Sequence, residues 1–211
     1  LGAPFVLGLT FLPLVIYLVR VQGLGGEALL HAIEPVAPYS AALGFAGIFA
    51  GTRWLARKDG LSLAALGWGP ISPIEVGIGA ISGAVLGALN HYWLYPWVIS
   101  AQPSFDPMVR QVSLWTVLGL FLVAVPSEDT LYRGYAFEVL QRRWGTLGAL
   151  LITSVFYTLL APGREWPIKL WALYFGLVLG CLRLWRRSLW APAIAHFLVS
   201  LGPKALRALG C

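Results

Sequence analysis

Three charged residues lie within a stretch of the chain that is otherwise hydrophobic enough to cross a membrane. Residues 112–125 contain no ionisable side chain, and Glu128, Asp129 and Arg133 follow directly. A charged side chain at the centre of a bilayer costs about 2.5–3.5 kcal/mol even on the most permissive scale. We therefore expect these three side chains to face one another or a polar cavity inside the protein.

The composition indicates an integral membrane protein. The 211 residues are 58% hydrophobic and 11% charged, whereas soluble domains contain about 45–50% apolar and about 25% charged residues. Several apolar runs approach the roughly 20 residues that a spanning helix needs. We predict an all-α membrane protein, a polytopic bundle of about seven transmembrane helices that forms one domain over residues 1–211.

The net charge of +6 is explained by topology and not by a nucleic-acid partner. The cations stand in short clusters between apolar runs, which is where they set the orientation of membrane helices. We expect the loops at residues 53–58, 142–143 and 183–187, with eight Lys and Arg against six on the opposite loops, to share the cytoplasmic side or its equivalent. Cys181 and Cys211 match neither a disulfide framework nor a metal-binding spacing.

The apolar runs divide the chain into its predicted spans. These cover approximately residues 1–19, 39–55, 74–97, 111–143, 146–160, 168–185 and 189–201. Pro126 is expected to interrupt the hydrogen-bond ladder midway along the fourth span. Gly79, Gly83 and Gly87 repeat every four residues in the third span, and they form either a ridge for close helix packing or simply a glycine-rich helix.

The charged stretch itself supports two interpretations. On a helix Asp129 and Arg133 can pair on one face, whereas Glu128 points roughly 100° away and lacks a local partner. A carboxylate at a membrane cavity is a candidate general base. The alternative is that the three charges form one buried polar network that holds the helices in register.

The last predicted span supplies a polar partner. His196 lies in its middle, and Ser200 follows one turn later on the same face. A neutral imidazole can be a packing residue, a proton relay, or a metal or pigment ligand, and one histidine does not choose among these roles. His91 stands among aromatic residues at the end of the third span, so we interpret it as part of an interfacial aromatic belt. No cofactor is predicted, and a metal or pigment contact at His196 or His91 stays an alternative.

Three motifs in the same order resemble those of the CPBP family, the intramembrane CAAX-protease and bacteriocin-processing group. The sequence EDTLYRG at residues 128–134 resembles the EExxxRG signature of that family. Residues 179–196 resemble the segment that leads into its HxxxN motif, and residues 61–67 are similar to the short stretch before its third span. The resemblance covers about residues 58–203 and implies a CPBP-protease-like fold for this core.

The resemblance also implies site residues. In the family the first Glu of the signature activates water, two histidines of the FxxxH and HxxxN motifs hold and polarise it, and the Asn assists the oxyanion. Carried over by position, these roles and the motif arginine fall on Glu128, Arg133, Phe156 as the start of FxxxH, and His196 as the start of HxxxN.

Three positions depart from the family pattern. Asp129 replaces the second Glu, Leu160 stands where the histidine of FxxxH is expected, and Ser200 stands where Asn or Asp is expected. Leucine holds neither water nor a metal, and loss of one catalytic group commonly lowers the rate by a factor of about 10²–10⁴.

Two functions follow from the resemblance and its departures. The first is a non-proteolytic or impaired pseudoprotease that keeps Glu128, Asp129, Arg133 and His196 as a structural network. It would act as a membrane scaffold or accessory subunit, with lipids and other integral membrane proteins as partners. The alternative is an active intramembrane endopeptidase in which Glu128 and His196 activate water.

Overall fold

The computed structural model describes residues 20, 22–23, 36–94, 96–97, 100, 113–161 and 166–208, so the first predicted span lies outside the described residues. Within these ranges every regular element is a helix, which confirms the predicted all-α class. The elements are α3 (Ala37–Lys58), α4 (Leu63–Leu66), α5 (Pro73–Leu89), η2 (Asn90–Leu94), α8 (Leu114–Asp129), η3 (Thr130–Ala136), α9 (Phe137–Leu160), α10 (Trp166–Arg186) and α11 (Trp190–Ala208).

Three segments of the described chain are long and apolar enough to cross a membrane. They are Pro73–Leu94, Leu118–Leu160 and Trp166–Arg186, and Trp190–Leu201 is a shorter apolar helix. The 43 residues of Leu118–Leu160 contain most of the fourth predicted span and all of the fifth. The predicted count of seven is therefore approximate, while the polytopic membrane bundle is confirmed.

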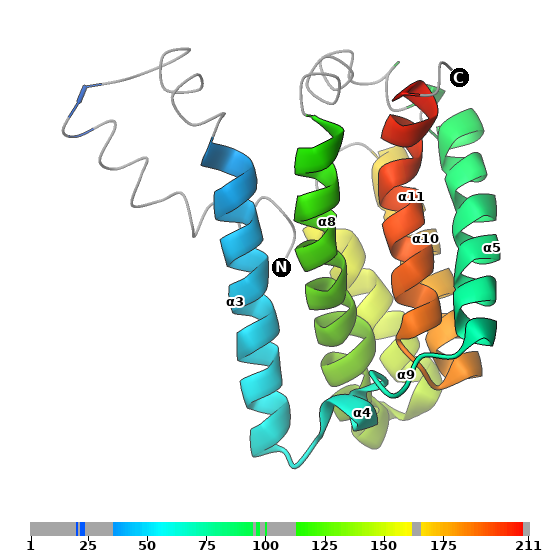
Figure 1. The fold of residues 1–211 in the computed structure, drawn as a ribbon. Helices are drawn as coiled ribbons and strands as arrows, with labels where there is room; N and C mark the ends of the chain where they lie inside the picture. The colour runs from blue at the N-terminus through cyan, green and yellow to red at the C-terminus, as the bar shows by residue number, and fades with distance from the viewer. Residues whose placement is uncertain are drawn as a thin grey trace.

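The helices stand side by side in a bundle (Figure 1). Helices α3, α8, α11 and α5 are arranged across the front of this view, α9 and α10 lie behind them, and the short α4 crosses the lower end. One apolar core cluster joins α5, α10 and α11 through Leu86, Phe175, Leu179, Ala195 and Val199. This cluster holds the middle of α11, where His196 lies.

Two glycines bring α5 into backbone contact with α11. A Cβ atom at Gly79 would lie 2.8 Å from the carbonyl oxygen of Ala191 and 2.8 Å from Cβ of Ile194. A Cβ at Gly83 would lie 3.0 Å from Cα of Ala195, whereas Gly87 has open space. The close-packing interpretation of the glycine repeat therefore holds for its first two members.

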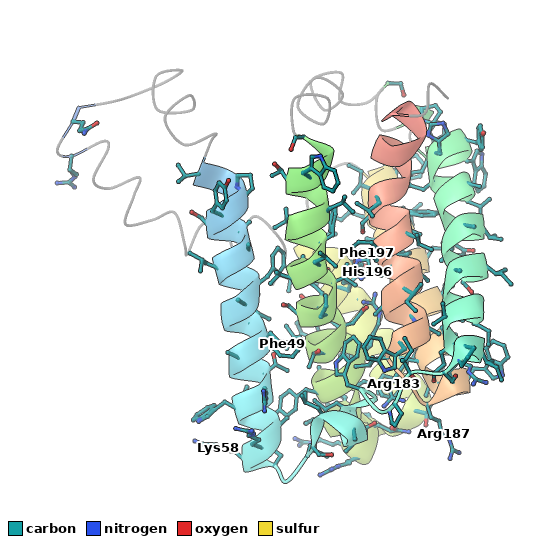
Figure 2. The ribbon with its side chains drawn as sticks, in the orientation of Figure 1. Phe49, Lys58, Arg183, Arg187, His196 and Phe197 are labelled. Carbon is teal, nitrogen blue, oxygen red and sulfur yellow. The ribbon has the colours of Figure 1, made fainter. Side chains whose placement is uncertain are left out.

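A backbone break separates the fourth and fifth predicted spans where the sequence placed the boundary. Gly145 has φ 69° and ψ 177° within α9, a conformation that is essentially restricted to glycine. The preceding part of α9 carries the basic residues 142–143, and the following part crosses the bundle. The ends of α3 and α10, marked by Lys58 and Arg187, lie at the same lower end of the bundle as the start of α9 (Figures 1 and 2).

Candidate functional site

Pro126 lies inside α8 and has no N–H to donate to the helix ladder, yet the helix continues past it to Asp129. Ser127 Oγ donates to the carbonyl of Val123 at 2.6 Å, and Thr130 Oγ1 donates to the carbonyl of Pro126 at 2.6 Å. Both hydroxyls therefore donate hydrogen bonds to backbone carbonyls close to the proline. Instead of breaking, the helix widens into the π-helix η3 at Thr130, and such π-helical turns are frequent at functional sites.

Asp129 and Arg133 form a buried ion pair across the junction of α8 and η3, as their spacing predicted. Arg133 Nη1 donates to Asp129 Oδ1. The exposed fraction of Asp129 is 0% and that of Arg133 is 3%. A pair so completely removed from water needs close geometry to offset its desolvation, so each charge depends on the other.

His196 lies between the two carboxylates. Its Nε2 is 3.7 Å from Glu128 Oε2, and its Nδ1 is 3.5 Å from Asp129 Oδ1. Figure 2 places the side chain midway along α11, inside the bundle. The predicted partner from the last span is thus found: Glu128, which has no partner on its own helix, faces an imidazole from α11.

Tyr157 from α9 completes the cluster. Its ring centroid is 4.8 Å from Cζ of Arg133, and its ring meets the ring of His196 edge to face at 6.2 Å. Phe175 of α10 makes a second edge contact with His196 at 5.2 Å. The imidazole is therefore bounded by carboxylates on one side and by two aromatic rings on the other.

The remaining motif positions lie outside these contacts. Phe156 is 55% exposed, Leu160 is the last residue of α9 and is partly buried, and no hydrogen bond joins Ser200 to the described residues of the cluster. His91 lies in η2, where its ring contacts Tyr92 at 4.9 Å. The interfacial role of His91 stays a prediction.

The segment that follows α4 ties the site to the start of α11. Trp68 Nε1 donates to Thr130 Oγ1 at 2.7 Å, and Trp190 Nε1 donates to the carbonyl of Gly69 at 2.7 Å. The two indoles meet edge to face with 4.8 Å between centroids. The amide of Leu189 also donates to the carbonyl of Gly67 at 2.9 Å. This segment therefore links η3, which carries Arg133, to α11, which carries His196.

The cluster retains polar atoms without a protein partner. Asp129 Oδ2, Arg133 Nε, Arg133 Nη2 and His196 Nδ1 are buried and have no hydrogen bond to the described protein. A neutral imidazole donates from one nitrogen only, whereas an imidazolium donates from both. Across the described residues no group of three or more His, Cys, Asp or Glu side chains has the arrangement of a metal site. The arrangement can hold a proton or a small polar molecule between Glu128 and His196.

A helical bundle with a Glu-Asp pair, an arginine one turn later and an inward-facing histidine on α11 is the arrangement that the CPBP resemblance implies. In a comparison with family models, residues 110–202 match the family described as type II CAAX prenyl endopeptidase Rce1-like. Comparisons with curated proteins and with solved structures found no match. The matched segment contains every residue of the cluster, and the resemblance to the CPBP family is confirmed.

Sequence reasoning missed Tyr157, Trp68 and Thr130. The motif letters direct attention to Phe156, yet the neighbouring aromatic residue is the one that faces His196. One available signal is the helical period: Ser154 and Tyr157 are three residues apart and share the inner face of α9. The contact of Trp68 with Thr130 joins residues 62 positions apart, and no local pattern encodes it.

Proposed function

We propose that this CPBP membrane protein is a non-proteolytic or impaired pseudoprotease whose buried network serves the architecture of a membrane scaffold or accessory subunit. The observation that carries the proposal is the ring of Tyr157. Through this ring, α9 contacts both His196 and Arg133. Helix α9 contains no histidine that could supply a second imidazole.

The chemistry of peptide hydrolysis explains why this matters. An attacking water needs a base to take its proton and further groups to hold it and to stabilise the charge that develops on the carbonyl oxygen. Glu128 and His196 supply one carboxylate and one imidazole. Arg133 binds Asp129 through Nη1 and lies against the ring of Tyr157, while its Nε and Nη2 are buried without a partner in the described protein.

The inward position of Tyr157 supports Ala161 beside Leu160 as a candidate for the place of the missing histidine. A helix brings residues four apart onto one face, so the partner of the inward-facing Tyr157 is Ala161, whereas Leu160 follows the exposed Phe156. Ala161 directly follows α9 with φ −60° and ψ 140°. Neither an alanine methyl group nor a leucine side chain can hold water, and the proposal stands in either register.

The second candidate is an active intramembrane endopeptidase that uses Glu128 and His196 alone. Two observations favour it: the 3.7 Å separation of their side chains and the unpartnered polar atoms beside them. An apolar groove of about 470 Å³ lies between α3, α8 and α11 and is lined by Val125 and Ala193, each three residues from a polar residue of the site. Such a groove suits an apolar substrate segment.

Cleavage assays separate the two functions. The purified chain, reconstituted in liposomes, is incubated with a farnesylated CAAX peptide, the substrate class named by the matched family, and with a panel of transmembrane peptides. We expect no cleavage that differs between the wild type and Glu128→Gln. Cleavage that is lost in Glu128→Gln and in His196→Ala would establish the endopeptidase instead.

Restoring an imidazole tests the architecture directly. Under our proposal Ala161→His gains Glu128-dependent cleavage more readily than Leu160→His, because position 161 follows the inward face of Tyr157. Glu128→Gln in the same background is the control. Cleavage gained by Leu160→His alone would show that position 160, four residues after Phe156, is the one that faces the site.

The scaffold role has its own readout. Solubilised from its native membrane in a mild detergent, the chain is expected to migrate in an assembly larger than the purified protein. Glu128→Gln, which leaves the surface unchanged, should not alter that assembly. If the chain migrates as a single-chain particle both when it is solubilised from the native membrane and after purification, the subunit role is excluded.

A further inference from the structure

Three exposed tryptophans on three different helices each carry a cation against the indole ring. The pairs, with the distance from the cationic group to the ring centroid, are Trp54–Lys58 at 3.8 Å in α3, Trp144–Arg143 at 5.9 Å in α9 and Trp185–Arg186 at 5.6 Å in α10. The exposed fractions of the three tryptophans are 55%, 54% and 66%. The same local arrangement, an exposed tryptophan with a cation over its ring, therefore occurs three times.

The three pairs lie at one end of the bundle. They belong to the C-terminal end of α3, the first part of α9 and the C-terminal end of α10, which meet at the lower end in Figure 1. Lys58 and Arg187 mark opposite sides of this end in Figure 2. We call the six residues of the three pairs the tryptophan–cation collar.

Acidic groups at this end already have partners elsewhere. Asp59 accepts a hydrogen bond from the hydroxyl of Tyr135 at 2.8 Å, and Glu138 pairs with Arg183 at 3.1 Å. The described carboxylates make no ion pair with any cation of the collar. Further exposed cations, namely Arg53, Arg57, Arg142 and Arg187, adjoin the collar. The end therefore presents a positive charge that the protein does not neutralise.

At the opposite end, the aromatic residues that the structure describes make no such contact with a described cation. Trp93 stacks with Trp97, and Trp97 contacts Trp166. The cation placed nearby, Lys169, donates to the carbonyls of Thr158 at 3.1 Å and Ala161 at 2.7 Å, so its ammonium is occupied by the end of α9. Among the described side chains, both ends of the bundle carry tryptophans, but only the tryptophans of the collar are paired with cations.

We propose that the tryptophan–cation collar binds the headgroups of anionic phospholipids in the membrane leaflet that it faces. Indole rings favour the level of the headgroups, with an apolar body in the acyl region and an N–H toward water. A cation held over such a ring stays at that level and meets the negative charge of the lipid phosphate there. The contact is independent of the network around Glu128 and of any proteolysis.

Native mass spectrometry of the full-length purified chain in detergent tests the proposal with phosphatidylglycerol and phosphatidylcholine added in equal amounts. We expect wild-type protein to retain phosphatidylglycerol preferentially, and this preference to fall as the ammonium acetate concentration rises. The variant Lys58→Gln, Arg143→Gln, Arg186→Gln should lose retention by roughly fivefold for each cation removed.

Two further variants distinguish the collar from overall net charge. Arg20→Gln, Lys204→Gln, Arg207→Gln removes the same charge before α3 and at the far end of α11, and it should keep the preference. Trp54→Leu, Trp144→Leu, Trp185→Leu keeps every charge and should weaken the preference. Equal retention of both lipids by the wild type, or equal loss in the distal and collar charge variants, would overturn the proposal.

Discussion

The ring of Tyr157 lies on the guanidinium of Arg133, with 4.8 Å between the ring centroid and Cζ. Arg133 is held at the same time by Asp129, so a carboxylate and an aromatic face share one buried cation. A desolvated cation–π contact contributes about 2 kcal/mol. Tyr157 is thus a member of the polar network as well as of the apolar core.

Replacement of Tyr157 by leucine is predicted to lower the free energy of unfolding by about 2–4 kcal/mol, because both the cation–π contact and the packing against His196 are lost. Tyr157→Phe keeps the ring and should stay within about 0.5 kcal/mol of the wild type. Thermal melting of the detergent-solubilised variants measures both effects. Equal destabilisation by the two substitutions would show that the hydroxyl carries the contribution and not the ring.

The ion pair between Asp129 and Arg133 predicts strong coupling in a double-mutant cycle. Arg133→Met leaves Asp129 buried without its partner and should cost about 3–5 kcal/mol. Adding Asp129→Leu removes the stranded charge, so the double variant should be more stable than Arg133→Met alone. The cycle is measured by melting curves, and additive effects of the two changes would mean that the charges do not depend on each other.

The contact of α5 with α11 predicts that an added side chain lowers the stability of the protein at Gly79 but not at Gly87. Gly79→Ala places a Cβ against Ala191 and Ile194 and should destabilise the protein by about 1–3 kcal/mol. Gly87→Ala is the matched control, since a Cβ there meets open space and alanine favours the helix by about 1 kcal/mol. Melting temperatures that shift equally for the two variants would contradict the close approach.

The hydrogen bond from Trp68 to Thr130 predicts a small loss of stability when either partner is replaced, and the two losses should not add. Trp68→Phe removes the N–H donor and keeps an aromatic ring, so it should cost about 1 kcal/mol. Thr130→Val removes the acceptor, and after that change Trp68→Phe should have little additional effect. The comparison uses melting curves of the two single variants and the double variant; an undiminished effect of Trp68→Phe in the Thr130→Val background would rule out this bond.

Part of the site could be predicted from the sequence because membrane burial is a strong constraint. Glu128 lacks a partner on its own helix, and an uncompensated carboxylate in hydrocarbon is costly, so an inward-facing polar residue elsewhere was required. His196 was the candidate in the last span, and the structure brings the two side chains to 3.7 Å. The spacing of Asp129 and Arg133 likewise predicts their pair.

The parts that could not be predicted depend on helix rotation and on long-range contacts. Adjacent aromatic residues such as Phe156 and Tyr157 differ by roughly 100° around a helix, and the motif letters alone do not show which one faces inward. Pro126 removes one donor from the helix ladder as expected, but no motif predicts that the chain becomes a π-helix at Thr130. Both outcomes depend on what neighbouring elements contact.

The glycine contacts of α5 also bear on how such a site changes during evolution. The position of His196 is held by a neighbouring helix that contributes no chemistry, through Gly79 and Gly83 against α11. Substitutions on α9 can therefore remove a catalytic group without displacing the histidine. The contact between the helices and the polar cluster depend on different residues, so a change in one leaves the other in place.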